Sequence, residues 1–107
     1  MREIKFRFWS KILKHFVIPN NDIFVGALKD KNMIVMQFTG LKDKNGKEIF
    51  EGDKMTLKDK ENLNIGEVYF DEEWYAFKLK THVSTYWLHE AEEVIGNQFE
   101  NQELLER

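Results

Sequence analysis

Apolar and polar residues alternate along most of this chain with a period of two residues, which is typical of strands and not of amphipathic helices. The first alternating segment, Glu3–Trp9, is a predicted strand. Its two faces carry Ile4, Phe6 and Phe8 on one side, and Lys5, Arg7 and Trp9 on the other. Successive strand side chains point to opposite faces of a sheet, so we expect the first set to face the core.

Seven further segments are also predicted strands, and most end at residues that favour turns. They are His15–Ile18, Ile23–Val25, Met33–Phe38, Lys54–Lys58, Ile65–Phe70, Trp74–Lys80 and Ser84–His89. Short helical turns are expected only at Glu90–Glu93 and Asn101–Glu106. Short strands at this spacing indicate an all-β fold, a small antiparallel β-barrel or sandwich.

A hairpin is predicted from Ile65–Phe70 and Trp74–Lys80, because the acidic residues between them favour a turn. In that hairpin Tyr75, Phe77 and Leu79 would share one face of the sheet.

The stretch Thr39–Asp53 holds the clearest turn signals in the chain. Asn45 and Gly46 supply the two residues with positive φ that a type I′ turn requires, so a tight hairpin is predicted there. Gly52 and Asp53 predict a second turn just before the next alternating segment. These four residues are expected to shape the fold and to carry no chemistry.

The length of 107 residues suits a single domain, residues 1–107, with one core. Hydrophobic residues make up 42% of the chain and aromatic residues 14%, so much of that core is expected to be aromatic. The chain contains no cysteine, which excludes disulfides, thiolate zinc sites and cysteine nucleophiles.

The location expected from the sequence is the cytoplasm. No apolar run approaches the roughly 18 residues of a membrane span. The N-terminus alternates charged and apolar residues and lacks the continuous apolar region of a signal peptide.

Charge is distributed unevenly along the chain. Residues 1–60 contain 13 Lys and Arg and 8 Asp and Glu, a net charge of +5, whereas residues 61–107 contain 3 and 11, a net charge of −8. Either the two halves interleave in one fold and neutralise each other, or they form separate positive and negative regions that are used for binding.

Three segments carry a resemblance to a known family: MREIKFRFW, MQFTGLKDKNGKEIFEGDKM and EVIGNQFENQELL. In this order and spacing they resemble the YopX family of phage and prophage proteins. The resemblance implies an all-β, barrel-containing protein encoded by a phage or prophage of bacteria, with no assigned activity and no catalytic residues to transfer. Residues 12–31 match no part of the family pattern, and their structure is left open.

The sequence gives little support for catalysis. Glu51 and Asp53 would share a strand face, so a small hydrolase with paired carboxylates is one alternative, but a turn-capping Asp53 is the simpler interpretation. The spacing of His82 and His89 fits no known zinc site, and Asp43–Glu48 lacks the glycine position of a calcium loop. We therefore expect no enzyme activity, no metal and no cofactor.

Binding is the expected mode of action, and two kinds of partner stay open. Lys5, Arg7 and Trp9 could grip a single-stranded nucleic acid through phosphate contacts and base stacking, unless Trp9 is buried against another strand or subunit. The apolar run Met33–Phe38, the aromatic content and the charge split favour protein association instead, either as a homo-oligomer or with a host protein. We prefer protein association.

Overall fold

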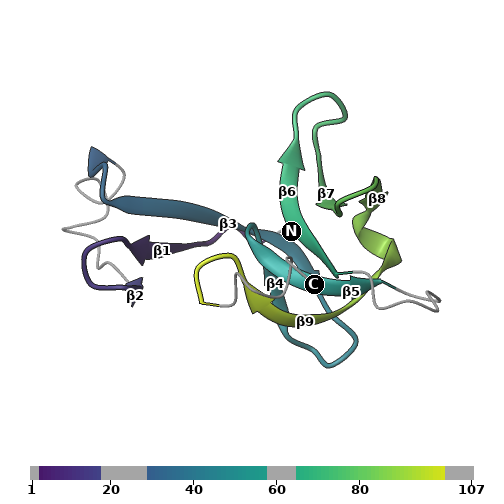
Figure 1. The fold of residues 1–107 in the computed structure, drawn as a ribbon, viewed down its shortest axis with the longest axis horizontal. Coiled ribbons are helices and arrows are strands. Elements are labelled where there is room, and N and C mark those ends of the chain that lie inside the picture. The colour runs from purple at the N-terminus through teal and green to yellow at the C-terminus, as the bar shows by residue number, and fades with distance from the viewer. Residues whose placement is uncertain (1–2, 18–28, 58–64, 101–107) are drawn as a thin grey trace.

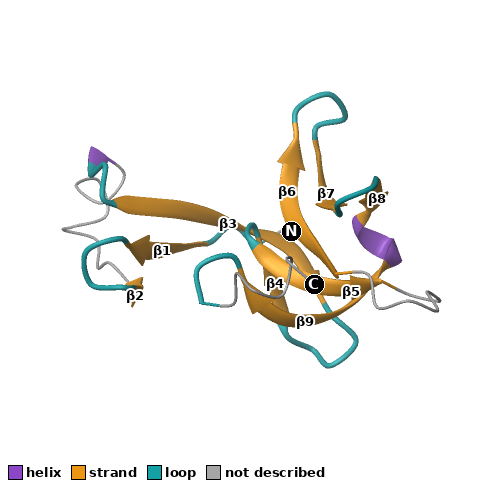
Figure 2. Ribbon diagram, in the orientation of Figure 1, coloured by secondary structure: helices purple, strands orange, loops and turns teal. Residues whose placement is uncertain are grey.

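The computed structural model describes residues 3–17, 29–57 and 65–100, and their regular secondary structure is almost entirely antiparallel strand (Figures 1 and 2). The elements are β1 (Phe6–Ser10), β2 (His15–Val17), β3 (Met33–Lys42), β4 (Glu48–Phe50), β5 (Asp53–Leu57), β6 (Ile65–Asp71), β7 (Ala76–Lys80), β8 (Thr85–Trp87), the 3₁₀ turn η1 (Leu88–Glu90) and β9 (Ala91–Asn97). The all-β prediction is confirmed. The predicted strand Ile23–Val25 and helical turn Asn101–Glu106 lie outside the described residues.

The strands form two sheets, with orders β2-β1-β3-β4 and β8-β7-β6-β5-β9. The second sheet bends round on itself as a half-barrel, and we call it the curled sheet (Figure 1). The long strand β3 pairs first with β1, from Met33 to Gln37, and then with β4, from Phe38 to Lys42. We call β1, β2, the turn between them and residues 33–37 the arm, because they project away from the curled sheet (Figure 1).

The curled sheet and β4 enclose a cluster of eight buried residues, of which Met55 and Leu79 are fully buried. The cluster consists of Ile49, Met55, Leu57, Val68, Leu79, Leu88, Ala91 and Val94, with Phe77 and Tyr86 packed against it. The predicted placement of Met55 and Leu57 on one buried face is thus confirmed. The expectation of an aromatic core is wrong for this cluster, because its buried members are aliphatic residues and methionine.

The first strand does not bury the face that alternation predicts. Ile4 is 71% exposed and Phe6 is 39% exposed, whereas Phe8 and Trp9, on opposite faces, are both buried. Burial along β1 therefore follows neither one strand face nor closeness to the curled sheet, because Phe6 pairs with Gln37 at the inner end of the arm while the buried Trp9 lies farther out and is covered by Phe99 and Phe16. The sequence pattern cannot show this, because it contains no information about which distant segments cover a strand.

The turn between β3 and β4 differs from the predicted type I′ turn. Gly46 has a φ of 82°, but Asn45 does not have a positive φ. The amide of Gly46 donates to the carbonyl of Asp43 (3.0 Å) and the amide of Asp43 donates to the carbonyl of Lys47 (2.8 Å). This is a turn over residues 43–46 whose last residue, Gly46, lies in the left-handed region, a common hairpin connection.

Asp43 explains the shift of that turn. Its Oδ1 accepts hydrogen bonds from the amides of Asn45 and Lys47, both at 2.9 Å, which fixes the turn one residue earlier than predicted. Its Oδ2 accepts the amide of Val94 at 2.9 Å and so ties the turn to β9. The second predicted turn is present, with Gly52 at a φ of 85°.

The predicted hairpin is confirmed as β6 and β7, with Val68 opposite Leu79 and Phe70 opposite Phe77. Its turn is longer than expected, because the last pair is Asp71 with Ala76. Tyr75 therefore lies in the turn with a φ of 51°, and does not share a strand face with Phe77.

The predicted strand Ser84–His89 ends at Trp87, and the 3₁₀ turn η1 follows at Leu88–Glu90. The expected helical turn Glu90–Glu93 is wrong, because Ala91–Glu93 belong to β9. The amide of Trp87 donates to the carboxylate of Glu90 at 2.9 Å and so begins η1. Across the described ranges, the structure has no helix with the length and apolar character needed to cross a membrane.

Candidate functional site

Trp9, the aromatic residue of the predicted nucleic-acid site, is 6% exposed. Its ring stacks on Phe99, with centroids 5.0 Å apart and an interplanar angle of 11°, and meets the edge of Phe16 at 5.0 Å. Phe99 belongs to the turn after β9, so Trp9 joins the arm to the curled sheet. The structure thus places Trp9 at the contact between the arm and the turn after β9, and we call this contact region the joint.

Arg7 lies in the same joint. Its guanidinium forms an ion pair with Asp53, 2.6 Å from Oδ1, and lies 4.7 Å from the ring centroids of both Phe16 and Phe50. The Asp53 side chain is only 2% exposed. Burial raises the pKa of Asp53 above its usual value, while the charge of Arg7 and the amide of Phe50 oppose that rise. The Nε of Arg7 is buried and has no hydrogen-bond partner among the described residues.

Lys5, the third residue of the predicted site, pairs with Glu48 of β4 and lies 5.1 Å from the ring centroid of Phe38. Lys5, Arg7 and Trp9 therefore each contact another element of the protein. These contacts hold β1 and Lys5 against β4, β5 and the turn after β9.

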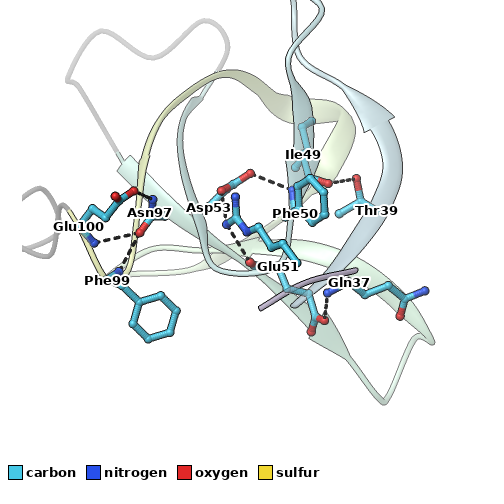
Figure 3. A network of polar contacts seen from close by, with 10 residues as sticks. Gln37, Thr39, Ile49, Phe50, Glu51, Asp53, Asn97, Phe99 and Glu100 are labelled. Atoms are coloured by element: carbon cyan, nitrogen blue, oxygen red, sulfur yellow. Dashed lines mark hydrogen bonds and ion pairs between the residues drawn. The ribbon is translucent and has the colours of Figure 1, made fainter. Parts of the chain in front are cut away.

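The carboxylates that could have formed a hydrolytic pair are held by different partners. Glu51 accepts the amide of Gln37 at 2.8 Å, and Asp53 accepts the amide of Phe50 at 2.8 Å besides its contact with Arg7 (Figure 3). Asp53 thus caps its own turn, as the simpler interpretation predicted. Glu48 is engaged by Lys5.

The histidines give no sign of a metal centre. His82 and His89 are exposed, and the Nδ1 of His15 lies 2.9 Å from the carbonyl oxygen of Phe16. Within residues 3–17, 29–57 and 65–100, no group of three or more His, Asp or Glu side chains could hold a metal ion.

A cavity of about 350 Å³, which we call the aromatic cavity, lies where the end of β3 meets the β6–β7 hairpin and η1. It is lined by Thr39, Gly40, Leu41, Phe70, Tyr75, Ala76, Phe77 and Leu88. Leu41 is 51% exposed, Phe70 40% and Tyr75 83%. The hydroxyl of Thr39 already donates to the carbonyl of Ile49 at 2.8 Å (Figure 3), so the lining is predominantly apolar.

A second cavity of about 330 Å³ adjoins the first, because both are lined by Leu41 and Leu88. Its other lining residues are mainly charged or polar and include Lys42, Asp43, Lys44, His89 and Glu92. Together the two cavities form a surface with an apolar part and a charged part, a composition that suits the binding of another polypeptide.

Tyr75 stands out for its backbone as well as its exposure. Its φ of 51° lies in the left-handed region, which is costly for a large side chain. Such strain persists only where the surroundings fix it, and it is found most often at functional sites. Here it holds an exposed ring at the mouth of the aromatic cavity.

The sequence pattern does not predict this cavity, because the elements that contribute Leu41, Phe77 and Leu88 meet only in the folded chain. The one local signal was the excess of aromatic residues in Trp74–Phe77 directly after an acidic turn.

Two further groups of apolar side chains are exposed. Trp74 and Trp87 meet edge to face at 5.5 Å, with the ammonium group of Lys78 4.7 Å from the Trp87 ring centroid. At the far end of the arm, Ile12 is 69% exposed and Leu13 is 58% exposed.

Comparison with known proteins gives a family and a fold. A family model described as YopX protein matches residues 12–106. The crystal structure of protein EF1440 from Enterococcus faecalis is similar, with a TM-score of 0.68, 23% sequence identity, and coverage of 98% of this chain and 99% of that chain. At that identity the likeness concerns the fold alone. No curated protein matches this chain.

Proposed function

This chain belongs to the YopX family, and we propose that it acts, as a phage- or prophage-encoded protein in the bacterial cytoplasm, by binding another protein chain and not by catalysing a reaction. The binding site in this proposal is the aromatic cavity together with the charged cavity beside it.

The main support is the aromatic cavity itself. Its volume of about 350 Å³ is at the lower end of the range of ligand pockets, and its rim carries Leu41, Phe70 and Tyr75, all at least 40% exposed. Exposed large apolar side chains that gather around a concavity are typical of interfaces. Aromatic anchors such as Tyr75 supply much of the binding energy in such sites, because they bury a large area with few rotatable bonds.

A protein partner suits the site better than a small polar substrate does. The aromatic cavity offers few polar groups to orient a substrate, since its threonine hydroxyl is already bound within the protein. The neighbouring cavity, lined by Lys42, Lys44 and Glu92, could bind the polar side chains that flank an apolar anchor in a polypeptide.

Binding of single-stranded nucleic acid has less support. Of the three residues that suggested it, Trp9 is covered by Phe99 and Phe16, Arg7 is paired with Asp53, and Lys5 is paired with Glu48. An aromatic platform for bases requires an accessible ring face.

The substitution Leu41→Glu tests the proposal, because it puts a charge on the rim without disturbing a buried residue. The matched control is Val83→Glu, which changes a residue 81% exposed in the turn after β7, outside the cavity lining. Crosslinking mass spectrometry of tagged protein, alone and in bacterial lysate, should give crosslinks near the cavity that Leu41→Glu removes and Val83→Glu keeps. Crosslinks that Leu41→Glu leaves intact would refute the proposal.

A further inference from the structure

The arm ends in two exposed aliphatic side chains with basic residues beside them. Ile12 and Leu13 occupy the turn between β1 and β2, and Lys11, Lys14 and His15 beside them are exposed. Two adjacent exposed aliphatic side chains at the tip of a projecting hairpin expose apolar surface to water unless a partner covers it. We call residues 11–15 the arm tip.

The arm tip has a defined conformation. The amide of Leu13 donates to the hydroxyl of Ser10 at 3.0 Å, and the amide of Lys14 donates to the Ser10 carbonyl at 2.9 Å. Ser10 is only 3% exposed, and Lys14 has a φ of 60°. The amide of Lys11 donates to the carbonyl of Asn32 at 2.8 Å. A fixed tip loses little entropy on binding, as expected of a preformed docking element.

The aromatic cavity has the complementary composition. Its lining is apolar, and the exposed Glu72 and Glu73 lie in the same turn as Tyr75 on its rim. The arm tip carries two lysines and no acidic residue, whereas this turn carries Asp71, Glu72 and Glu73 and no basic residue. Opposite charges around two apolar surfaces favour their association and fix its orientation.

One molecule cannot bring the two surfaces together. The arm tip lies at one end of the longest axis, whose extent is 46 Å, and the β6–β7 hairpin and η1 lie in the other part of the molecule (Figure 1). A contact between them must therefore join two copies.

We infer that the arm tip of one copy inserts Ile12 and Leu13 into the aromatic cavity of a second copy, with Lys11 and Lys14 facing the acidic turn of that copy. This rests on the proposed function, since it names the partner of the same cavity. The contact is head to tail, because the two surfaces differ, so repetition gives a closed ring or an open chain.

A mixing experiment tests this arrangement. The tip variant Ile12→Asp/Leu13→Asp keeps an intact cavity, and the cavity variant Leu41→Glu keeps an intact tip. In sedimentation velocity, wild-type protein should associate beyond a dimer, each variant alone should be a monomer of 12.9 kDa, and an equimolar mixture should form dimers only. A wild type that stops at a dimer would contradict this arrangement, because a reciprocal two-fold pair occupies both surfaces of each copy.

Charge reversal and a control variant refine the test. Lys11→Glu/Lys14→Glu should weaken association about ten-fold at low salt and less at high salt. Val83→Asp should associate like the wild type, because Val83 belongs to neither surface.

The other outcomes separate this inference from the proposed function. If the tip variant still associates while Leu41→Glu does not, the cavity binds a different segment and only the head-to-tail assignment is wrong. A wild-type monomer at every concentration overturns the assignment, and the lysate crosslinks of Leu41→Glu then decide the proposed function. If the wild type binds anionic lipid vesicles and the tip variant does not, the arm tip is a membrane contact and the inference is wrong.

Discussion

The curled sheet is held together by eight buried residues, all apolar, whereas the arm is joined to it by aromatic rings packed around an ion pair. The difference follows from shape. A curled sheet has an inside, so its strands can bury aliphatic side chains without specific partners. The arm projects from the curled sheet and encloses no interior of its own, so its contacts with the rest of the molecule are the directional ones made by Arg7 and Trp9.

The joint combines contacts that the core does not need. Arg7 lies between Phe16 and Phe50 and is paired with Asp53, while Trp9 stacks on Phe99. Burying an ion pair contributes little net stability, but it penalises any arrangement in which one charge is left unpaired. The core therefore supplies the stability here, whereas the joint fixes the direction in which the arm points.

The largest expected effect is in the curled sheet. Leu79→Ala should lower the free energy of unfolding by about 3 kcal/mol, because Leu79 is fully buried and its removal leaves a cavity. Urea denaturation measures this. Leu13→Ala is the control in the arm and should change stability by less than about 0.5 kcal/mol, since Leu13 is 58% exposed. Equal losses in the two variants would contradict the division into core and arm.

Arg7→Leu tests the joint. It leaves the buried carboxylate of Asp53 without its cation and should cost roughly 2–3 kcal/mol. The double variant Arg7→Leu/Asp53→Asn should regain part of that loss, because Asn keeps an acceptor for the Phe50 amide and carries no charge. The near-ultraviolet circular dichroism of the buried Trp9 should change with Arg7→Leu. A double variant as unstable as the single one would show that the ion pair is not the cause.

Two glycines with similar φ angles allow the stability cost of backbone strain to be distinguished from the cost of close packing. Gly52→Ala should cost about 2 kcal/mol, because φ is 85° and a Cβ would lie 2.7 Å from Nε2 of Gln98 and 3.2 Å from Sδ of Met36. Gly46→Ala, with φ of 82° and no atom within 4 Å, should cost about 1 kcal/mol. Thermal unfolding of both variants gives the difference. Similar losses would mean that the crowding at Gly52 is relieved by movement of Gln98.

The smallest effect concerns the turn that ties β3 to β9. Desolvation opposes ionisation of Asp43, but the amides of Val94, Lys47 and Asn45 outweigh it and lower the pKa of Asp43. A pKa that is lower in the folded state means that ionised Asp43 stabilises the fold above the unfolded value of about 3.9, and that this contribution is lost as pH falls through the folded pKa.

Asp43→Asn should therefore flatten the acid side of the stability profile below about pH 4, where the wild type loses this contribution. Denaturant midpoints from neutral pH to strong acid measure the slope. The pKa of Asp71 is also lowered, by the amides of Glu73 and Trp74 and the hydroxyl of Tyr69 against desolvation, so part of the slope should remain. An unchanged slope would show that Asp43 does not contribute to it.

Local sequence patterns predicted most of the strands, although β9 was not among the predicted segments. The period of two gave the all-β fold, the pairing of β6 with β7 and the buried face of Met55 and Leu57. Gly46 and Gly52 were predicted in turns, and both have the positive φ that explains a glycine there. These features depend on residues close together in the chain, which is why the sequence is sufficient for them.

The candidate site could not be predicted in the same way. Alternation placed Trp9 on an open face and Tyr75 on a strand, whereas Trp9 is covered by Phe99 and Tyr75 lies in a strained turn. The partner of Trp9 is distant in the chain, and the position of Tyr75 depends on the exact register of the β6–β7 hairpin, which alternation alone does not fix. The aromatic cavity likewise exists only because β3, the β6–β7 hairpin and η1 meet.

By itself, the sequence determined which segments extend, where the chain turns, and that the chain resembles the YopX family. Only the tertiary structure decided which ends of those strands are covered, that Asp43 and Asp53 join elements far apart in the chain, and where apolar surface stays exposed. The physical reason is that strand formation and turns depend on each residue and its near neighbours, whereas burial depends on what the rest of the chain places against it.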